Sequence, residues 1–103
     1  PRLDDMHPFA KKAAIEGLTR GLARHLGKDG IRVNTVIPGS VMTERQKALW
    51  HSPEASQAIL DAQVLPQGVE VEDIAAMALF LSSDNARRCS GRDYFVDAGW
   101  YGA

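Results

Sequence analysis

Residues 9–43, FAKKAAIEGLTRGLARHLGKDGIRVNTVIPGSVMT, decide how this chain folds. In the first half of the stretch, apolar side chains recur at steps of three and four residues, the spacing of one face of an α-helix. The residues on that face are Ile15, Leu18, Leu22 and Leu26. Gly27 and Gly30 predict the end of the helix, because glycine readily adopts the left-handed conformation that closes a helix.

A strand is predicted directly after the helix. Residues 31–37 are rich in β-branched side chains, and Pro38 and Gly39 end the run sharply. Ligands of open α/β sheets bind beyond the carboxyl ends of the strands. We therefore expect residues 38–43 to form a loop that holds a small molecule.

The predicted helix also carries a face of small residues, which are Ala10, Ala14, Gly17 and Gly21. A glycine inside a helix costs about 1 kcal/mol relative to alanine. Close approach of another backbone, from the sheet or from a partner helix, would offset that cost.

Short motifs follow one another in a fixed order along the chain. They are Lys12-Ala13-Ala14, Gly17-Leu18-Thr19-Arg20, Gly30-Ile31-Arg32-Val33-Asn34, Pro38-Gly39 with Thr43, Glu72-Asp73-Ile74-Ala75, and Val96-Asp97-Ala98-Gly99-Trp100. This set resembles the C-terminal half of the short-chain dehydrogenases/reductases. The resemblance implies an α/β fold, the C-terminal part of a Rossmann-like doubly wound parallel sheet, in the order helix, strand, lid helices, helix, last strand. Residues 1–103 would then form a single partial domain.

The resemblance implies a catalytic lysine at Lys12. The family has a tyrosine four residues earlier, whose phenol transfers a proton at the substrate oxygen with its pKa lowered by the lysine ammonium. That position is Pro8 here, and proline cannot transfer a proton. A frame shifted to Lys11 would put His7 at the tyrosine position, and histidine titrates near neutral pH. A solvated helix lysine with no catalytic role is the other reading of Lys12.

The resemblance also implies NAD or NADP as cofactor. The cofactor-binding positions carried over from the family are Lys12, Pro38, Gly39, Val41 and Thr43. In the family, backbone groups of this loop and the threonine hydroxyl hold the nicotinamide carboxamide. The sequence contains no glycine-rich turn for the pyrophosphate and no match to the family's upstream Asn and Ser. The resemblance assigns those elements to a half that precedes residue 1.

The resemblance implies that residues 44–63 correspond to the family's mobile lid over the substrate. Arg45, Gln46 and Trp50 look most like those of sugar 1-dehydrogenases that act on xylose or galactose, and they could bind hydroxyls and stack on a sugar ring. The alternative is a polar surface with one packed tryptophan. Ser52, Pro53 and Glu54 predict the cap and first turn of a helix within this region.

The rest of the chain divides into simpler elements. Residues 1–8 contain two prolines and are expected to be irregular. Acidic residues at 70, 72 and 73 predict a helix start, since the helix dipole favours them there. The predicted core stripe of that helix is Ile74, Met77, Ala78 and Leu81. Residues 93–96 predict the last strand.

The composition excludes several classes of function. The 103 residues are 45% hydrophobic and 24% charged with a net charge of −1, which is typical of one small globular domain. Neither nucleic acid nor a membrane is an expected partner. The histidines show no metal-ligand spacing, so no metal is expected, and the lone Cys89 is interpreted as a small core residue. A cytoplasmic location is the default expectation.

Two functional hypotheses follow. The first is the C-terminal portion of a nicotinamide-dependent oxidoreductase of the sugar dehydrogenase type, acting on a sugar or other alcohol. The second is a non-catalytic remnant, or an oligomerisation or interaction module of the same fold. Pro8 favours the second for this chain, and the isolated chain is expected to be inactive. A homo-oligomer, dimer or tetramer, is expected in either case.

Overall fold

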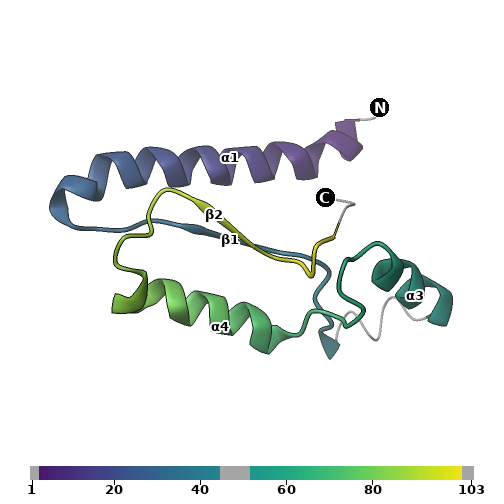
Figure 1. Cartoon of the computed structure of the whole chain (residues 1–103). Coiled ribbons are helices and arrows are strands. Elements are labelled where there is room, and N and C mark those ends of the chain that lie inside the picture. The colour runs from purple at the N-terminus through teal and green to yellow at the C-terminus, as the bar shows by residue number, and fades with distance from the viewer. Residues whose placement is uncertain (1–2, 45–51, 101–103) are drawn as a thin grey trace.

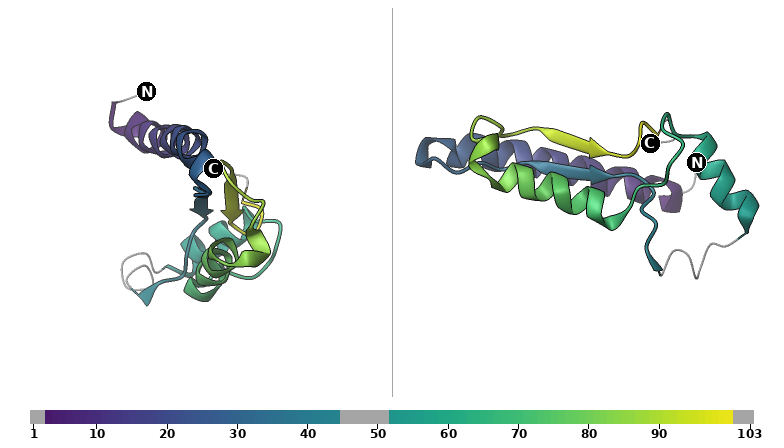
Figure 2. Two further views of the ribbon diagram at one scale, coloured as in Figure 1. Left: turned by 90° about the vertical axis from the view of Figure 1, so that its left-hand side faces the viewer. Right: turned by 60° about the horizontal axis from the view of Figure 1, so that its bottom comes forward.

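A computed structural model describes residues 3–44 and 52–100, and the side chains of 10–44 and 52–100. The elements are α1 (Leu3–Leu26), the 3-10 turn η1 (Gly27–Asp29), β1 (Thr35–Pro38), α3 (Pro53–Asp61), α4 (Val71–Ser82), the 3-10 turn η2 (Asp84–Ala86) and β2 (Asp93–Val96). Helices α1 and α4 lie on opposite faces of the two strands, and α3 lies beyond the strands' carboxyl ends (Figure 1; Figure 2).

The two strands form a parallel pair. Thr35 is opposite Asp93 at the amino end, and Pro38 is opposite Val96 at the carboxyl end. The chain passes from β1 to β2 through α4, as parallel strands require a crossover connection. The predicted α/β class and the order helix, strand, helix, last strand are therefore confirmed.

Helix α1 differs from the prediction at its start and agrees with it at its end. It begins at Leu3, so Pro8 lies within the helix and the expected irregular opening is wrong. Proline has a helical φ and removes one N–H donor, and the turns on either side continue around it. At the other end, Gly30 has a φ of 76° and donates its N–H to the Gly27 carbonyl at 3.0 Å.

Strand β1 is shorter than predicted, because residues 31–34 do not join the regular ladder. The Val33 N–H donates to Ser90 Oγ at 3.1 Å, and the Val33 carbonyl accepts from the Gly91 N–H at 2.7 Å. Asn34 Nδ2 donates to the Cys89 carbonyl at 2.9 Å. This segment is thus paired with the loop before β2 largely through side chains.

Helix α4 packs through the stripe predicted for it, except at one position. Its N-terminus is closed by a capping box in which the Glu70 N–H donates to Asp73 Oδ2 at 2.8 Å. Leu81 is buried, and Ile74 and Met77 are half-buried. Ala78 is exposed, so its assignment to the core is wrong; it lines a surface cavity beside Val36.

Little of the described chain is buried. The buried residues are Val69, Leu81, Ala86, Thr19 and Gln63. The accessible surface is 7,795 Å², against about 5,700 Å² for a compact monomer of this mass. The radius of gyration is 16.0 Å, against about 13 Å for a compact domain of this length. Apolar surface therefore remains uncovered within the chain.

No helix within residues 3–44 or 52–100 combines the length and the apolar character that crossing a bilayer requires.

Candidate functional site

The face of α1 that is turned toward the sheet is largely polar. Its members are less exposed than their neighbours and repeat at helical spacing: Lys12, Glu16, Thr19, Ala23 and Leu26. Thr19 is the buried centre of this face. Its Oγ1 lies 2.8 Å from the Ile15 carbonyl and 2.5 Å from Thr35 Oγ1. The hydroxyl pair fixes α1 against the start of β1.

Lys12 lies over the sheet, whereas Lys11 is exposed. The Lys12 Nζ atom is 5.4 Å from the centroid of the Phe95 ring, within the range of a cation–π interaction. Lys12 and Glu16 also line a cavity of about 270 Å³ together with residues 35–38. The structure thus brings Lys12 and Pro38 to one cavity at the carboxyl end of β1.

The predicted ligand loop leaves the sheet at Gly39. The Gly39 N–H donates to the Val96 carbonyl at 3.0 Å, so the loop starts beside the end of β2. A Cβ atom on Gly39 would lie 2.7 Å from both Cα and Cβ of Asp97. Only glycine fits there without a backbone shift.

The same loop is then held against the segment that precedes α4. Val41 forms a parallel bridge with Val69, and the Met42 N–H donates to the Val69 carbonyl at 2.8 Å. The Thr43 N–H donates to the Val41 carbonyl at 2.9 Å. Gly39, Val41 and Thr43 therefore lie in one braced loop beyond the end of β1, and none of the three lines the Lys12 cavity.

A second turn, at residues 97–99, meets this region, although no structural role is predicted for it above. The Ala98 carbonyl accepts from the N–H groups of Val64 and Leu65, each at 3.0 Å. Gly99 donates its N–H to Asp97 Oδ1 at 2.9 Å. The run Asp97-Ala98-Gly99 was the available signal, since Asp and Gly are turn residues. This turn joins the segment after α3 to the end of β2.

The predicted lid is only partly described. Arg45, Gln46 and Trp50 lie outside the described residues. Helix α3 begins as predicted, with the Ala55 N–H donating to Ser52 Oγ at 3.1 Å. Gln63 is buried, and its Nε2 donates to the carbonyls of Leu65 and Gln67 at 3.2 and 2.9 Å. Gln63 therefore supports the loop after α3.

No group of three His, Cys, Asp or Glu residues within 10–44 and 52–100 is arranged to hold a metal ion.

Comparison with known proteins agrees with this geometry. The family model described as "Enoyl-(Acyl carrier protein) reductase" matches residues 5–101. The chain is 52% identical over 89 residues to D-xylose 1-dehydrogenase of Caulobacter vibrioides, covering 86% of this chain and 36% of that protein. It is 39% identical over 88 residues to "Probable galactose dehydrogenase" of Rhizobium meliloti, covering 85% and 34%.

A solved structure shows the same arrangement of elements. 4-Hydroxyisoleucine dehydrogenase complexed with NADH superposes with a TM-score of 0.84 at 33% identity, over 91% of this chain and 39% of that one. The chain thus spans little more than a third of the length of these relatives. Matched along nearly all its own length, the chain belongs to the short-chain dehydrogenase/reductase family and corresponds to the C-terminal region of that family.

Proposed function

We propose that this chain is the nicotinamide-side and lid portion of an NAD(P)-dependent sugar dehydrogenase. The main support for this proposal is that Lys12 and Pro38 line the same cavity at the carboxyl end of β1. The identity of 52% to a D-xylose 1-dehydrogenase points to a sugar rather than another alcohol as substrate.

The residues present fit the nicotinamide end of a dinucleotide. Gly39 lets the loop backbone pass close to Asp97 at the end of β2, and residues 38–43 follow the strand end at which α/β sheets bind ligands. In our proposal, backbone groups of Pro38, Gly39 and Val41 and the Thr43 hydroxyl hold the nicotinamide carboxamide. A nicotinamide held there would supply hydride transfer to or from the substrate carbon.

Lys12 has the role of a fixed cation in this proposal. Its ammonium lies beside the strand end, where it would hold the cofactor and lower the pKa of a nearby phenol. This chain has Pro8 at the position from which the family's phenol acts. In this proposal the proton at the substrate oxygen moves through a group outside residues 1–103, and the isolated chain is expected to be inactive.

The lid residues complete the proposed substrate site. Arg45, Gln46 and Trp50 would bind sugar hydroxyls and one ring face. The competing function, a non-catalytic assembly module, is favoured by Pro8 and by the large uncovered surface.

The coding sequence upstream of Pro1 gives the first test. A glycine-rich turn encoded there, together with a tyrosine at the position of Pro8 when the gene is read in another frame, supports the dehydrogenase. NAD- and NADP-dependent oxidation of xylose and galactose is then measured for the complete protein, with Lys12→Gln and Lys11→Gln compared. Selective loss of activity in Lys12→Gln supports the assigned role. Equal activity of the two variants refutes it, and turnover by the 103-residue chain alone refutes the inactivity.

A further inference from the structure

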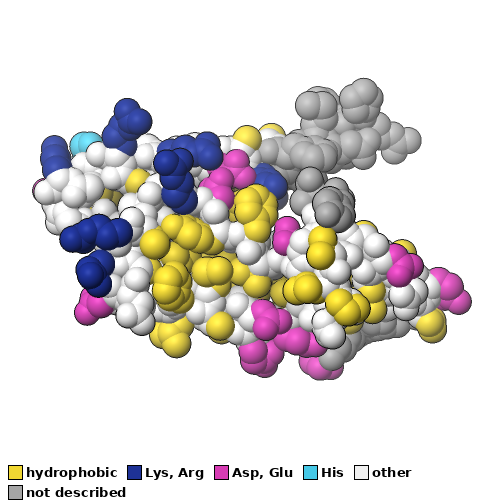
Figure 3. All heavy atoms as spheres, in the orientation of Figure 1, with side chains coloured by type: hydrophobic (Ala, Val, Ile, Leu, Met, Phe, Trp, Pro, Cys, Tyr) yellow, Lys and Arg dark blue, Asp and Glu magenta, His cyan; other side chains and the backbone are white. Residues whose placement is uncertain are grey.

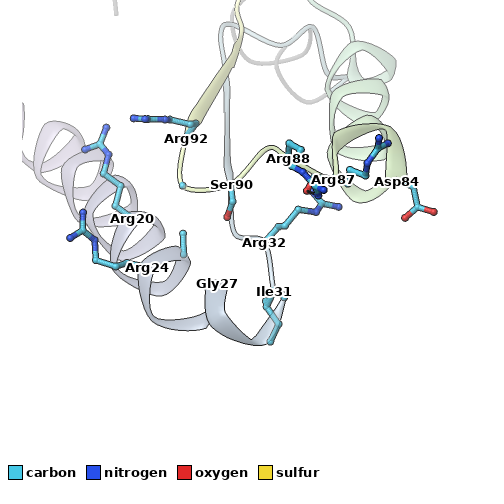
Figure 4. A pocket seen from close by; sticks show the side chains of 13 residues that line it. Arg20, Arg24, Gly27, Ile31, Arg32, Asp84, Arg87, Arg88, Ser90 and Arg92 are labelled. Carbon is cyan, nitrogen blue, oxygen red and sulfur yellow. Dashed lines mark hydrogen bonds between the residues drawn. The ribbon is translucent and has the colours of Figure 1, made fainter.

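Arginine side chains line a second cavity at the other end of the molecule. The cavity has a volume of about 790 Å³ and lies between the end of α1, the approach to β1 and the loop before β2. The arginines in its lining are Arg20, Arg24, Arg32, Arg87, Arg88 and Arg92. Figure 4 shows Arg20 and Arg24 on α1 to one side of the cavity, and Arg32, Arg87 and Arg88 grouped on the other.

The charge in this cavity is strongly unbalanced. Six of the 12 Lys and Arg residues of the chain line it, and Asp84 is the one carboxylate among the lining residues. The whole chain has a net charge of −1, so the excess of positive charge is confined to this part of the molecule. The space-filling view shows the basic side chains gathered at this end, with the acidic ones mainly toward the other (Figure 3).

Three of the six guanidinium groups already have protein partners. Arg32 donates to the carbonyls of Leu81 and Ser83 at 2.6 and 3.3 Å, and Arg20 pairs with Asp93 at 3.4 Å. Arg88 reaches the Arg87 carbonyl at 3.5 Å. Within the described residues, no carboxylate pairs with the guanidinium groups of Arg24, Arg87 or Arg92. The like charges of these three side chains repel one another.

We infer that this cavity binds a small soluble anion that carries two or more phosphate groups. Guanidinium groups donate paired hydrogen bonds in a planar fork that matches phosphate oxygens. A multiply charged anion would neutralise several of them at once, which one carboxylate cannot do. The concave shape and the volume of the cavity suit a small molecule better than the flat surface of a protein partner.

The anion site is separate from the proposed dehydrogenase site. Ile31 and Arg32, in the cavity lining, precede β1, whereas Gly39 follows it at the opposite end. A nicotinamide held at residues 38–43 would leave this cavity free. Binding here can therefore fail or succeed independently of the proposed function.

The test is calorimetric titration with inorganic triphosphate at low ionic strength. The protein used is the whole product of the gene. Arg24→Gln/Arg87→Gln is compared with Lys11→Gln/Lys28→Gln, which removes the same charge from exposed positions outside the cavity. We expect saturable binding that weakens by about tenfold or more in the arginine pair and by less than about threefold in the lysine pair.

Thermal unfolding gives a second readout. Triphosphate should raise the unfolding midpoint of the native protein and of the lysine pair, and have little effect on the arginine pair. Equal losses in both double variants would show non-specific attraction and overturn the site. Absence of saturable binding, or citrate binding as tightly as triphosphate, would overturn the assignment to a phosphate anion.

Discussion

Gly39 lies directly against Asp97, since the Cα and Cβ atoms of Asp97 are 2.7 Å from the position of a Cβ atom on Gly39. This contact joins the loop after β1 to the turn after β2. Gly39→Ala should therefore force the two backbones apart and lower the free energy of unfolding by about 1–3 kcal/mol, measured by urea denaturation. Gly27→Ala is the control, because nothing lies within 4 Å of its added Cβ. Equal effects of the two changes would contradict the contact.

Arg32, in the segment that precedes β1, links this segment to the end of α4 through hydrogen bonds. Its two donors reach the carbonyls of Leu81, in the last turn of α4, and of Ser83, the residue that follows the helix. Arg32→Lys removes the fork and should cost about 1–3 kcal/mol of stability in thermal or urea unfolding. Arg20→Lys is the comparison, because the Arg20 side chain is 59% exposed and its ion pair with Asp93 is worth less than about 1 kcal/mol. A larger loss in Arg20→Lys would be inconsistent with these assignments.

Ala98 has a left-handed backbone with a φ of 54°. This conformation is costly for any residue with a Cβ atom, so Ala98→Gly should raise stability by up to about 1 kcal/mol. Ala58→Gly, in the exposed part of α3, should lower it by about as much, because glycine is a poor helix former. Unfolding midpoints of the two variants should thus move in opposite directions; a shared direction would contradict the turn geometry.

We expect Tyr94 to contribute to the loss of stability of the folded chain at alkaline pH. A hydrogen bond with the Cys89 thiol, followed by burial, raises the pKa of the Tyr94 hydroxyl above its ordinary value of 10.0. Between pH 10 and the raised pKa, the folded state binds more protons than the unfolded state. Stability from this group is therefore complete below pH 10 and falls as the pH rises through the folded pKa. Tyr94→Phe should flatten the fall of the unfolding free energy across this range, and an unchanged slope would argue against it.

The sequence predicts the elements well, because each depends on local chemistry. The turn at Gly30, the cap at Ser52 and the strand at 93–96 are all where the turn residues, the capping residue and the alternating pattern indicate. The strand start at residue 31 is wrong because Ser90 and Gly91, nearly 60 positions away, bond to Val33. Such pairing depends on the whole fold and leaves no local signal.

Less of the candidate site can be predicted from the sequence. Periodicity identifies the apolar face of α1, but it does not say what covers that face. Within this chain, the polar face through Lys12 and Thr19 contacts the sheet, and Leu18 on the apolar face is 63% exposed. The bracing of the ligand loop by Val69 and Asp97 joins segments distant in sequence, and no motif predicts it.

The exposed face of α1 predicts self-association. Ile15, Leu18 and Leu22 are 55%, 63% and 39% exposed, and no other part of the described chain approaches Gly17 or Gly21 within 4 Å of an added Cβ. The close approach expected for these glycines is thus not made by the described part of this chain, and we predict that a partner helix makes it. We expect a dimer or tetramer whose interface buries more than about 1,000 Å².

Sedimentation at micromolar concentration tests this association. Leu18→Glu places a charge, and Gly17→Leu a bulky side chain, on the proposed contact, so both should shift the protein toward smaller species. Leu79→Glu, at a residue of α4 that is 74% exposed, makes the same change on another helix. Dissociation by Leu79→Glu but not by Leu18→Glu would place the interface elsewhere. A compact monomer that unfolds cooperatively would rule the association out, because the uncovered apolar face would then be stable in water without a partner.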